Sequence, residues 1–431
     1  MGARYPLPMA TTADPVAQIC ARAKQASHTL ATLDGGIRNA GLEAMASAVE
    51  NRAPEILAAN ARDIEAGEEA GLQPALIDRL KLTEERLEGI ARDVHAIAAL
   101  PDPVGETIDG HRLPNGLDVR RVRVPIGVIA VIYEARPNVT IDCSALCLKS
   151  GNAIVLRGSS TAAHSNAVLA QVAQSAVAAA GLPEGAISIV ASGDRDELRQ
   201  IVTQEGQVDL VIPRGGEGLK QALKEHATVP VIYAAAGNCH VFVDSTADVD
   251  DAVAIAVNAK VQRPGVCNSA ETLLVHRDVA SEFLPRALRE LRELGVELRA
   301  DGRARAAAGE LGDSLAEATE EDWATEYLAL ILAVRVVDSV EEAIEHVNRY
   351  GSGHSEAIVT GSTASGKAFS EGVDAACVYV NASTRFTDGG VFGMGAEIGN
   401  STQKLHARGP IGVRELTTYK YLVQGSGQVR E

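Results

Sequence analysis

Short apolar runs alternate with helix-like stretches from about residue 124 to residue 360, and this alternation restricts the fold more than any other feature. The runs are rich in β-branched residues, which favour strands. The first series has expected strands at 128–133, 153–157, 187–190 and 210–212, and expected helices at 142–148, 161–180 and 196–203. Because neighbouring parallel strands need a crossover that is usually a helix, the pattern predicts a doubly wound parallel sheet of the α/β class.

A second series of the same kind follows and predicts a second α/β layer. Its expected strands are 240–243, 272–276, 328–337 and 356–360, and its expected helices are 247–259, 279–294 and 340–350. Ahead of both series, residues 14–100 are predicted to be helical, since apolar residues recur every three or four positions at 54–66 and 76–100. Between residues 107 and 124, the pair Asn115-Gly116 predicts the turn of a β-hairpin.

Length, charge and cysteine usage exclude several classes of protein. A chain of 431 residues exceeds the roughly 250–300 residues at which single cores split, so two or more domains are expected. Forty basic against 57 acidic residues give a net charge of −17, which argues against nucleic-acid and anionic-membrane partners. No apolar run reaches the roughly 18–20 residues of a membrane span, and residues 1–20 lack the apolar core of a signal peptide. Six scattered cysteines are typical of reduced thiols, so a cytoplasmic location is expected.

The most informative cysteine is Cys267, within QRPGVCNSAE at 262–271. A thiol attacks a carbonyl as the thiolate, which backbone N–H groups and a nearby Arg in a Gly/Pro loop favour. A lone cysteine is more often a small buried apolar residue, so this interpretation depends on the flanking residues. Cys143 and Cys147 share a helix face, but further ligands at metal-binding spacing are not evident, so no metal site is expected.

Gly-rich turns are candidate phosphate sites because backbone N–H groups at helix N-termini attract anions. The segment GSTASGK at 361–367 resembles a Walker A loop, but Ala368 follows where a Ser or Thr would hold Mg²⁺, so a nucleoside triphosphatase is disfavoured. The turn IPRGGEG at 212–218 follows a predicted strand and opens a helix, which suits a pyrophosphate. At 151–160, GNAIVLRGSS ends a strand in basic and hydroxyl residues that suit a ribose or a 2′-phosphate.

Four segments together resemble one family, and the match runs from about residue 15 over nearly the whole chain. They are VPIGVIAVIYEARPNVTIDCSALCLKSGNAIVLRGSS (124–160), QRPGVCNSAETLLVH (262–276), EAIEHVNRYGSGHSEAIVT (342–360) and VNASTRFTDGGVFGMGAEIGNSTQKLHARGPIGVRELTTYKY (380–421). The family is that of the gamma-glutamyl phosphate reductases, within the aldehyde dehydrogenase superfamily. The resemblance implies a Rossmann-like cofactor domain, an α/β catalytic domain and a small oligomerisation element. The expected ranges are 10–106 and 125–236 for NADPH binding, 237–385 for catalysis, and 107–124 and 400–431 for oligomerisation.

The resemblance also implies roles for individual residues. Cys267 matches the family's nucleophile, and Asn138 matches the residue whose side-chain amide donates to the oxyanion. The implied cofactor contacts are Lys149, Arg157 and Ser159 at the adenosine end of NADPH, Gly215 and Gly216 at the pyrophosphate, and Glu326 at the nicotinamide ribose. The implied substrate contacts are Arg263, His354, Ser383 and Arg385, for which ion pairing or loop structure is an equally good explanation.

The implied reaction is the NADPH-dependent reduction of L-glutamyl 5-phosphate to L-glutamate 5-semialdehyde, with release of phosphate, through a thioester at Cys267. It is a step of proline biosynthesis. Hydrolysing aldehyde dehydrogenases carry a Glu that activates water, whereas the corresponding stretch at 229–243 contains no acidic residue, which supports a reductase. A homo-oligomer is implied, and glutamate 5-kinase, which makes the substrate, is a candidate partner.

Three alternatives stay open. The chain could be another acylating or aldehyde-oxidising member of the superfamily, a noncatalytic scaffold with this fold, or a Cys–His hydrolase. The presence of both Cys267 and Asn138 argues against a scaffold. No His lies close to Cys267 in the sequence to support a hydrolase.

Overall fold

The computed structural model describes residues 15–190, 194–233 and 236–430. The chain forms two compact units, the first from residues 1–232 and 413–431 and the second from residues 233–412. Each unit contains a parallel sheet with helices between its strands, so the predicted α/β class is confirmed. Within the described residues, none of the helices combines the length and the apolar content needed to cross a bilayer.

The first unit joins a helical N-terminal part to a parallel sheet and a separate antiparallel sheet. Its helices are α1 (Val16–Leu30), α2 (Gly35–Asn51), α3 (Ala53–Glu69), α4 (Pro74–Leu80), α5 (Glu84–Ala99), α6 (Val139–Lys149), η1 (Ser160–Ala162), α7 (Ala163–Ala179), α8 (Arg195–Val202) and α9 (Glu217–His226). Its strands are β1 (Thr107–Arg112), β2 (Asp118–Pro125), β3 (Val128–Tyr133), β4 (Ala153–Arg157), β5 (Ile187–Val190), β6 (Leu210–Arg214) and β16 (Thr417–Gln424).

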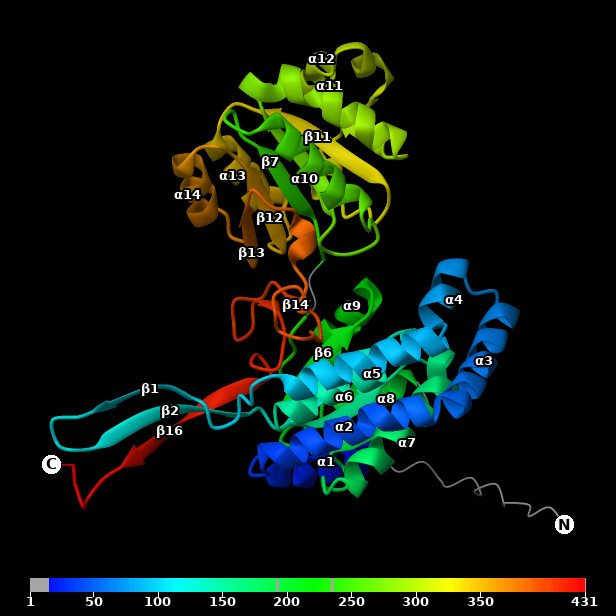
Figure 1. The fold of residues 1–431 in the computed structure, drawn as a ribbon, viewed down its shortest axis with the longest axis vertical. Helices are drawn as coiled ribbons and strands as arrows, with labels where there is room; N and C mark the ends of the chain where they lie inside the picture. The colour runs from blue at the N-terminus through cyan, green and yellow to red at the C-terminus, as the bar shows by residue number, and fades with distance from the viewer. Residues whose placement is uncertain (1–14, 191–193, 234–235, 431) are drawn as a thin grey trace. The chain divides into compact units, whose positions relative to one another are not determined.

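The parallel sheet of the first unit has the strand order β5-β4-β3-β6 among the described residues. Every residue of β3 is buried, as expected of a strand covered by helices on both faces. Helix α1 contacts β4 and β5, while α6 contacts β3 and β4 and α7 contacts β5. Helices α2 and α3 pack on α7, and α5 packs on α6, which gives an outer helical layer (Figure 1). The predicted strands 128–133, 153–157 and 187–190 are confirmed.

The predicted helical stretch at 76–100 is interrupted, because residues 81–83 separate α4 from α5. The Thr83 hydroxyl accepts a hydrogen bond from the N–H of Arg86 (3.2 Å) and thereby caps α5. The buried side chain of Asn60, in α3, binds backbone groups on both sides of the α4 end. Apolar periodicity did not reveal the interruption because these backbone groups find their partner in a different helix.

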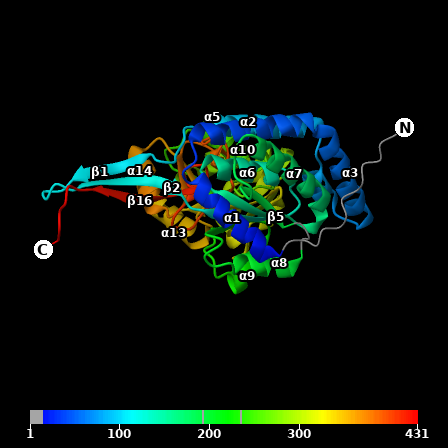
Figure 2. The same ribbon diagram turned by 90° about the horizontal axis from the view of Figure 1, so that it is seen from below.

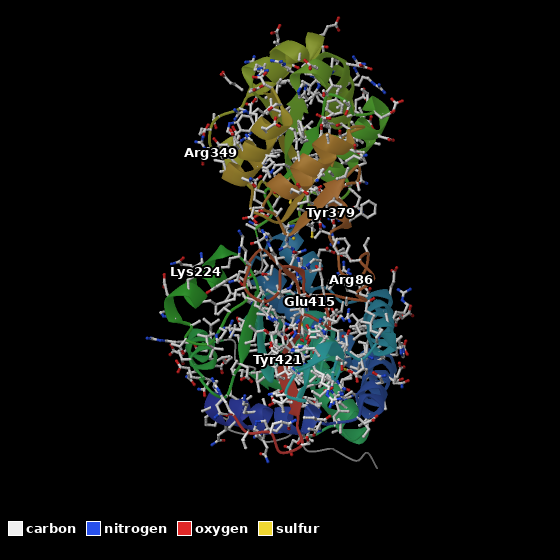
Figure 3. The ribbon with its side chains drawn as sticks, turned by 90° about the vertical axis from the view of Figure 1, so that its left-hand side faces the viewer. Arg86, Lys224, Arg349, Tyr379, Glu415 and Tyr421 are labelled. Atoms are coloured by element: carbon white, nitrogen blue, oxygen red, sulfur yellow. The ribbon has the colours of Figure 1, made fainter. Side chains whose placement is uncertain are left out.

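The predicted hairpin is confirmed, since β1 and β2 pair antiparallel and Gly116 in the turn has a left-handed φ of 90°. Strand β16 pairs antiparallel with the other edge of β2. The resulting sheet, β1-β2-β16, extends away from the helices of the first unit (Figures 1 and 2). All of β1 and nearly all of β16 are exposed, including Tyr421 with 60% of its surface accessible (Figure 3).

The second unit is a larger parallel α/β sheet followed by a C-terminal loop region. Its helices are α10 (Val249–Val261), α11 (Arg277–Glu293), α12 (Gly302–Ala307), η2 (Gly309–Ser314), η3 (Asp322–Ala324), α13 (Val340–Tyr350), α14 (Thr363–Gly372) and η4 (Thr384–Phe386). Its strands are β7 (Cys239–Val243), β8 (Ala270–His276), β9 (Glu297–Ala300), β10 (Ala316–Glu317), β11 (Ile331–Val337), β12 (Ser355–Val359), β13 (Cys377–Val380), β14 (Asn400–Ser401) and β15 (Gly409–Pro410).

The main sheet of the second unit has the order β10-β9-β11-β8-β7-β12-β13, with parallel pairs. Successive side chains of a strand point to opposite faces, so each strand contributes to two cores. Val241 and Val243 pack in a cluster with α10 and α11, whereas Phe242 packs in a cluster with α13 and α14. The sheet is therefore covered on both faces, as the apolar runs predicted.

The division into units differs in part from the predicted domain ranges. The boundary between residues 232 and 233 lies close to the predicted one at 236/237. Residues 400–412, predicted with the oligomerisation element, belong instead to the second unit. There β14 pairs with β15, and Gln403 accepts a hydrogen bond from the N–H of Tyr233 (3.0 Å). The oligomerisation role of β1-β2-β16 stays a prediction.

Candidate active site

Cys267 lies on the loop between α10 and β8, and its side chain is partly exposed. Four other cysteines are buried: Cys20, Cys143, Cys147 and Cys239. Burial raises the pKa of each of these four thiols, so they hold their protons at neutral pH and are poor nucleophiles. Cys377 is also partly exposed, but burial raises its pKa as well.

The backbone of Gly237 lies directly against the backbone of Cys267. A Cβ atom at position 237 would stand 1.5 Å from the Cys267 carbonyl oxygen, so only glycine fits there. The Gly237 N–H donates to Oε1 of Glu326 (2.6 Å), and the Cys239 thiol donates to the Cys267 carbonyl (3.2 Å). The predicted stretch 229–243, which lacks an acidic residue, therefore contacts the Cys267 loop; its Ala234 and Ala235 lie outside the described residues.

Two arginines bring positive charge to the Cys267 loop. Arg385 donates through Nε to Oε1 of Gln262, on the same loop (2.9 Å). Burial and the nearby charge of Arg263 lower the pKa of Arg385, and the charge of Cys267 opposes that change. Arg385 is thus within electrostatic range of both Arg263 and Cys267. Positive charge beside a thiol favours the nucleophilic thiolate.

The loop around η4 is tied to the Cys267 loop by Asn268, which the sequence did not single out. Its Nδ2 donates to the carbonyl of Thr387 (2.8 Å), and its own carbonyl accepts from the Thr384 hydroxyl (2.7 Å). These bonds join residues more than a hundred positions apart in the chain. They fix Arg385, which stands between the two threonines, relative to the Cys267 loop.

The other two predicted substrate contacts are buried in the described unit. Ser383 is 4% exposed and accepts a hydrogen bond from the N–H of Arg385 (3.3 Å). His354 is fully buried, with Nδ1 at 2.8 Å from the Ser355 hydroxyl, and burial lowers its pKa to about 4. A neutral imidazole carries no charge to form an ion pair, but its N–H still donates a hydrogen bond. His354 thus lies just ahead of β12, and its contact with the substrate stays a prediction.

Asn138 stands at the N-terminus of α6 in the first unit. Its Nδ2 donates to Oδ2 of Asp142, one helical turn later (2.8 Å). Burial raises the pKa of Asp142 to about 7, and the hydrogen bond from Asn138 opposes the rise. Because a carboxylate only accepts, the NH2 end of the Asn138 amide points toward Asp142 and donates one of its two protons there. Asp142 is a second functional candidate that the sequence did not reveal.

Four of the predicted cofactor residues gather at one edge of the first unit's parallel sheet. Arg157 ends β4, Ser159 follows it, and Gly215 and Gly216 follow β6. Since the strands are parallel, these residues lie at the carboxyl edge, where open α/β sheets bind their ligands. Arg157 donates to the carbonyl of Asp194 (2.9 Å), and burial lowers its pKa.

The turn at Gly215 and Gly216 already holds an anionic group. The Gly216 N–H, just ahead of α9, donates to Oε2 of Glu134 (3.2 Å), which follows β3. A Cβ atom at position 215 would approach the Glu134 carboxyl to 2.7 Å, so the glycine allows this close approach. The turn thus binds a carboxylate from the protein itself, as an anion-binding helix N-terminus should.

Lys149 is a correction to the predicted cofactor set. It ends α6 and precedes β4, so it lies at the amino edge of the sheet, opposite Arg157. Its Nζ is buried and donates to Oδ1 of Asn39 (2.8 Å) and to the carbonyl of Ala98 (2.7 Å). Lys149 therefore joins α6 to α2 and α5, and it does not stand with the other cofactor candidates.

The predicted site residues are divided between the two units. Asn138 and the cofactor candidates at the carboxyl edge belong to the first unit, whereas Cys267, Glu326, Arg263 and Arg385 belong to the second. Within the second unit, Glu326 is brought next to Cys267 through Gly237. Among the described residues, no group of three or more His, Cys, Asp or Glu side chains is placed to hold a metal ion.

Comparison with known proteins identifies the family. The sequence matches the aldehyde dehydrogenase family over residues 7–307 and 316–421. It is 56% identical to the gamma-glutamyl phosphate reductase of Moorella thermoacetica over 411 residues, which cover 95% of this chain and 97% of that one. It is 54% identical to the enzyme of the same name from Thermobifida fusca over 415 residues, 96% of this chain and 98% of that one.

Solved structures agree with this result. The crystal structure of gamma-glutamyl phosphate reductase from Thermotoga maritima has a TM-score of 0.94 at 46% identity, covering 97% of this chain and all (100%) of that one. An acetylating aldehyde dehydrogenase from Geobacillus thermoglucosidasius shares the fold, with a TM-score of 0.70 at 22% identity over 96% of this chain and 97% of that one. The chain therefore belongs to the gamma-glutamyl phosphate reductases, within the aldehyde dehydrogenase family.

Proposed function

We propose that the chain reduces L-glutamyl 5-phosphate to L-glutamate 5-semialdehyde with NADPH, releasing phosphate, as a step of proline biosynthesis. The observation that carries the proposal is the surroundings of Cys267, which is partly exposed, has Arg385 within electrostatic range and shares its loop with Arg263. The names of the relatives supply the substrate, and the loop supplies a nucleophile suited to an acyl phosphate. Reduced cysteines accord with a cytoplasmic location.

The chemistry assigned to the protein begins at the Cys267 thiolate. It attacks the γ-carbonyl carbon, the carbonyl oxygen becomes an oxyanion, and collapse of that adduct expels phosphate and leaves a thioester. Arg263 and Arg385 meet the negative charge of the phosphoryl group. The Cys267 N–H and the Asn138 amide are the proposed donors to the oxyanion, an effect typically worth about 3–4 kcal/mol per donor.

The carboxyl edge of the first unit suits a dinucleotide phosphate. Its fit rests on the turn at Gly216, which binds the Glu134 carboxylate in this structure. Arg157, at the end of β4, supplies the cation for a 2′-phosphate, and Ser159 supplies a hydroxyl for the ribose. Bound NADPH supplies a hydride to the thioester carbon. Glu326 is the proposed contact to the nicotinamide ribose, and Cys267 leaves as the thiolate when the hemithioacetal collapses.

Protection of the thioester from water distinguishes this proposal from aldehyde oxidation. The stretch 229–243 contains no acidic residue, and its Gly237 is packed against the Cys267 backbone. A carboxylate that activates water is therefore absent from the sequence at this position. The intermediate is left to react with the hydride.

A homo-oligomer is part of the proposal. The sheet β1-β2-β16 presents exposed side chains on both outer strands, among them Tyr419 and Tyr421. A sheet of this size with so little covered surface suits a partner subunit. Glutamate 5-kinase, the source of the acyl phosphate, is a further candidate partner.

The test runs the reaction in the oxidative direction. Reduction of NADP⁺ is followed by absorbance with pyrroline-5-carboxylate, which equilibrates with the semialdehyde, in the presence and absence of phosphate. Activity that requires phosphate and is lost in Cys267→Ala supports the proposal. Activity without phosphate would assign the chain to the aldehyde-oxidising alternative, and an inactive wild type would favour a scaffold.

A further inference from the structure

We propose that Lys260 and Glu271 form a positioning pair, which holds the Cys267 loop and the segment that carries Glu326 in the arrangement needed for reaction. The inference rests on the proposed function, in which Cys267 is the nucleophile and Glu326 contacts the cofactor. Both side chains are completely buried, so neither residue touches a substrate. Their effect on the reaction is therefore indirect.

The pair closes the base of the Cys267 loop. Lys260 lies in the last turn of α10 and Glu271 near the start of β8, so the two flank the loop residues 262–269. Lys260 Nζ donates to Oε2 of Glu271 at 2.6 Å. Ser269 strengthens the same closure, since its hydroxyl reaches the carbonyl of Lys260 (3.4 Å). The two ends of the loop are thus joined by side chains that exclude water.

The second carboxylate oxygen extends the connection to the Glu326 segment. Oε1 of Glu271 accepts a hydrogen bond from the N–H of Leu328, 57 positions along the chain (3.2 Å). Leu328 has a φ of 52°, in the left-handed region that a β-carbon disfavours. Its side chain is 47% exposed, so tight packing of the side chain does not impose this conformation. We therefore assign to the hydrogen bond with Glu271 the role of holding the Leu328 backbone in place.

The connection returns to the nucleophile through Glu326. That residue stands two positions before Leu328 and accepts the Gly237 N–H at 2.6 Å. Gly237 in turn lies against the Cys267 backbone, where no side chain fits. Glu271 therefore contacts one side of the site through Lys260 and the other through Leu328, and Cys267 lies between the two connections.

Charge burial gives an independent reason to assign a role to the pair. Buried ion pairs seldom stabilise a fold more than an apolar pair of the same size, because desolvation offsets their attraction. An apolar pair at 260 and 271 could fill the space but could not bind the Leu328 N–H. The polar pair thus does what packing alone cannot: it fixes a backbone conformation next to the site.

Two uncharged double variants separate the hydrogen bond from packing. Lys260→Met with Glu271→Gln keeps a carbonyl oxygen that can accept the Leu328 N–H, whereas Lys260→Met with Glu271→Leu removes the acceptor. We expect the Leu variant to lower kcat about tenfold to a hundredfold with less than a threefold change in KM. The Gln variant should recover most of that loss. Equal kcat in the two variants would overturn the proposal.

The reactivity of the Cys267 thiol provides a readout that does not depend on the proposed reaction. Alkylation of Cys267 by iodoacetamide is followed across pH by peptide mass spectrometry. We expect the midpoint of the pH–rate profile to rise in the Leu variant and to return toward wild type in the Gln variant. If wild type lacks reductase activity but the two variants still differ in their alkylation profiles, the proposed function fails and the positioning role stands. Identical alkylation profiles in the two variants would refute the positioning role.

A control variant and one measurement on wild type keep the test independent of folding failure. Asp244→Asn changes a buried carboxylate just after the carboxyl end of β7, whereas Gly237 precedes its amino end. The Asp244 carboxylate accepts hydrogen bonds from the Thr246 and Thr360 hydroxyls. It should leave kcat and Cys267 alkylation within twofold of wild type. In wild type, the Leu328 amide should exchange slowly with deuterium despite its exposed loop. Fast exchange of that amide would overturn the proposal without any variant.

Discussion

Each unit places a carboxyl group near a residue assigned to the chemistry: the partly buried Asp142 beside Asn138 in the first unit, and the fully buried Glu271 at the base of the Cys267 loop in the second. Burial raises the pKa of both to about 7. Glu271 engages both oxygens, one with Lys260 and one with the Leu328 N–H. Asp142 engages Oδ2 with Asn138, whereas its Oδ1 has no hydrogen-bond partner among the described residues.

The two carboxylates therefore differ in how much of the structure their hydrogen bonds hold together. Glu271 connects three segments of the chain, so its loss should disturb a whole loop. Asp142 contacts a neighbour one turn away on the same helix, so its loss should disturb the orientation of one amide. A buried oxygen without a partner also costs free energy when the group is charged. The contribution of Asp142 to the free energy of unfolding should therefore depend on pH more strongly than that of the paired Glu271.

Removal of the Cys267 thiol should have a larger effect on activity than any change at Asp142 or Glu271. Cys267→Ala should lower reductase activity by about four orders of magnitude or more, because the thioester cannot form. Since the side chain is partly exposed, the free energy of unfolding should change by less than about 0.5 kcal/mol. Rates of NADP⁺ reduction and urea unfolding check both statements. Cys377→Ala is the control, with activity expected within about twofold of wild type.

The next effect concerns the amide that Asp142 orients. Asn138→Ala should lower kcat by about 10²–10³-fold, the loss typical of an oxyanion donor, with a smaller change in KM. Steady-state kinetics in the oxidative direction measure it. A loss below fivefold would show that Asn138 is no oxyanion donor, and it would remove the basis for comparing Asp142 with Glu271.

A smaller effect is expected at Asp142 itself. Asp142→Ala should lower kcat about tenfold, because the Asn138 amide loses the acceptor that orients it. Asp142→Asn retains a carbonyl oxygen of the same reach and should stay within about threefold of wild type. Comparison of kcat for the two variants is the measurement. Equal losses would mean that the charge of Asp142, rather than its hydrogen bond, matters.

The smallest effect is on stability and depends on pH. The pKa of Asp142 is about 7 in the folded protein, against its usual 3.8. Between pH 3.8 and about pH 7, the folded state therefore binds more protons than the unfolded state. The contribution of Asp142 to stability is complete below pH 3.8 and is lost as the pH rises through about 7. Asp142→Asn should gain about 1–3 kcal/mol relative to wild type between about pH 4 and about pH 8. Urea unfolding across this range measures the change, and a difference that does not vary with pH would contradict it.

Much of the fold could be predicted from local patterns. The strands 128–133, 153–157 and 187–190 and the helix 340–350 were predicted with the bounds observed, because buried parallel strands are continuous apolar runs and surface helices are periodic. The interruption between α4 and α5 was missed because it depends on Asn60 in another helix. Cys267 was predicted to be the nucleophile from the residues around it, and that role stays a prediction; the structure adds that it is among the two less buried thiols.

The sequence by itself determined the α/β class and singled out the Cys267 loop and the Gly-rich turn ahead of α9, since each is a short-range pattern of apolar, glycine and charged residues. Only the tertiary structure decided the roles of side chains whose partners are distant in the chain. Lys149 looked like a cofactor contact but is buried against Asn39 and Ala98. Glu271 was not singled out in the sequence, but it accepts a hydrogen bond from the N–H of Leu328, 57 positions away. A charged residue inside an apolar element indicates that a partner exists, but the fold alone brings that partner within hydrogen-bond distance.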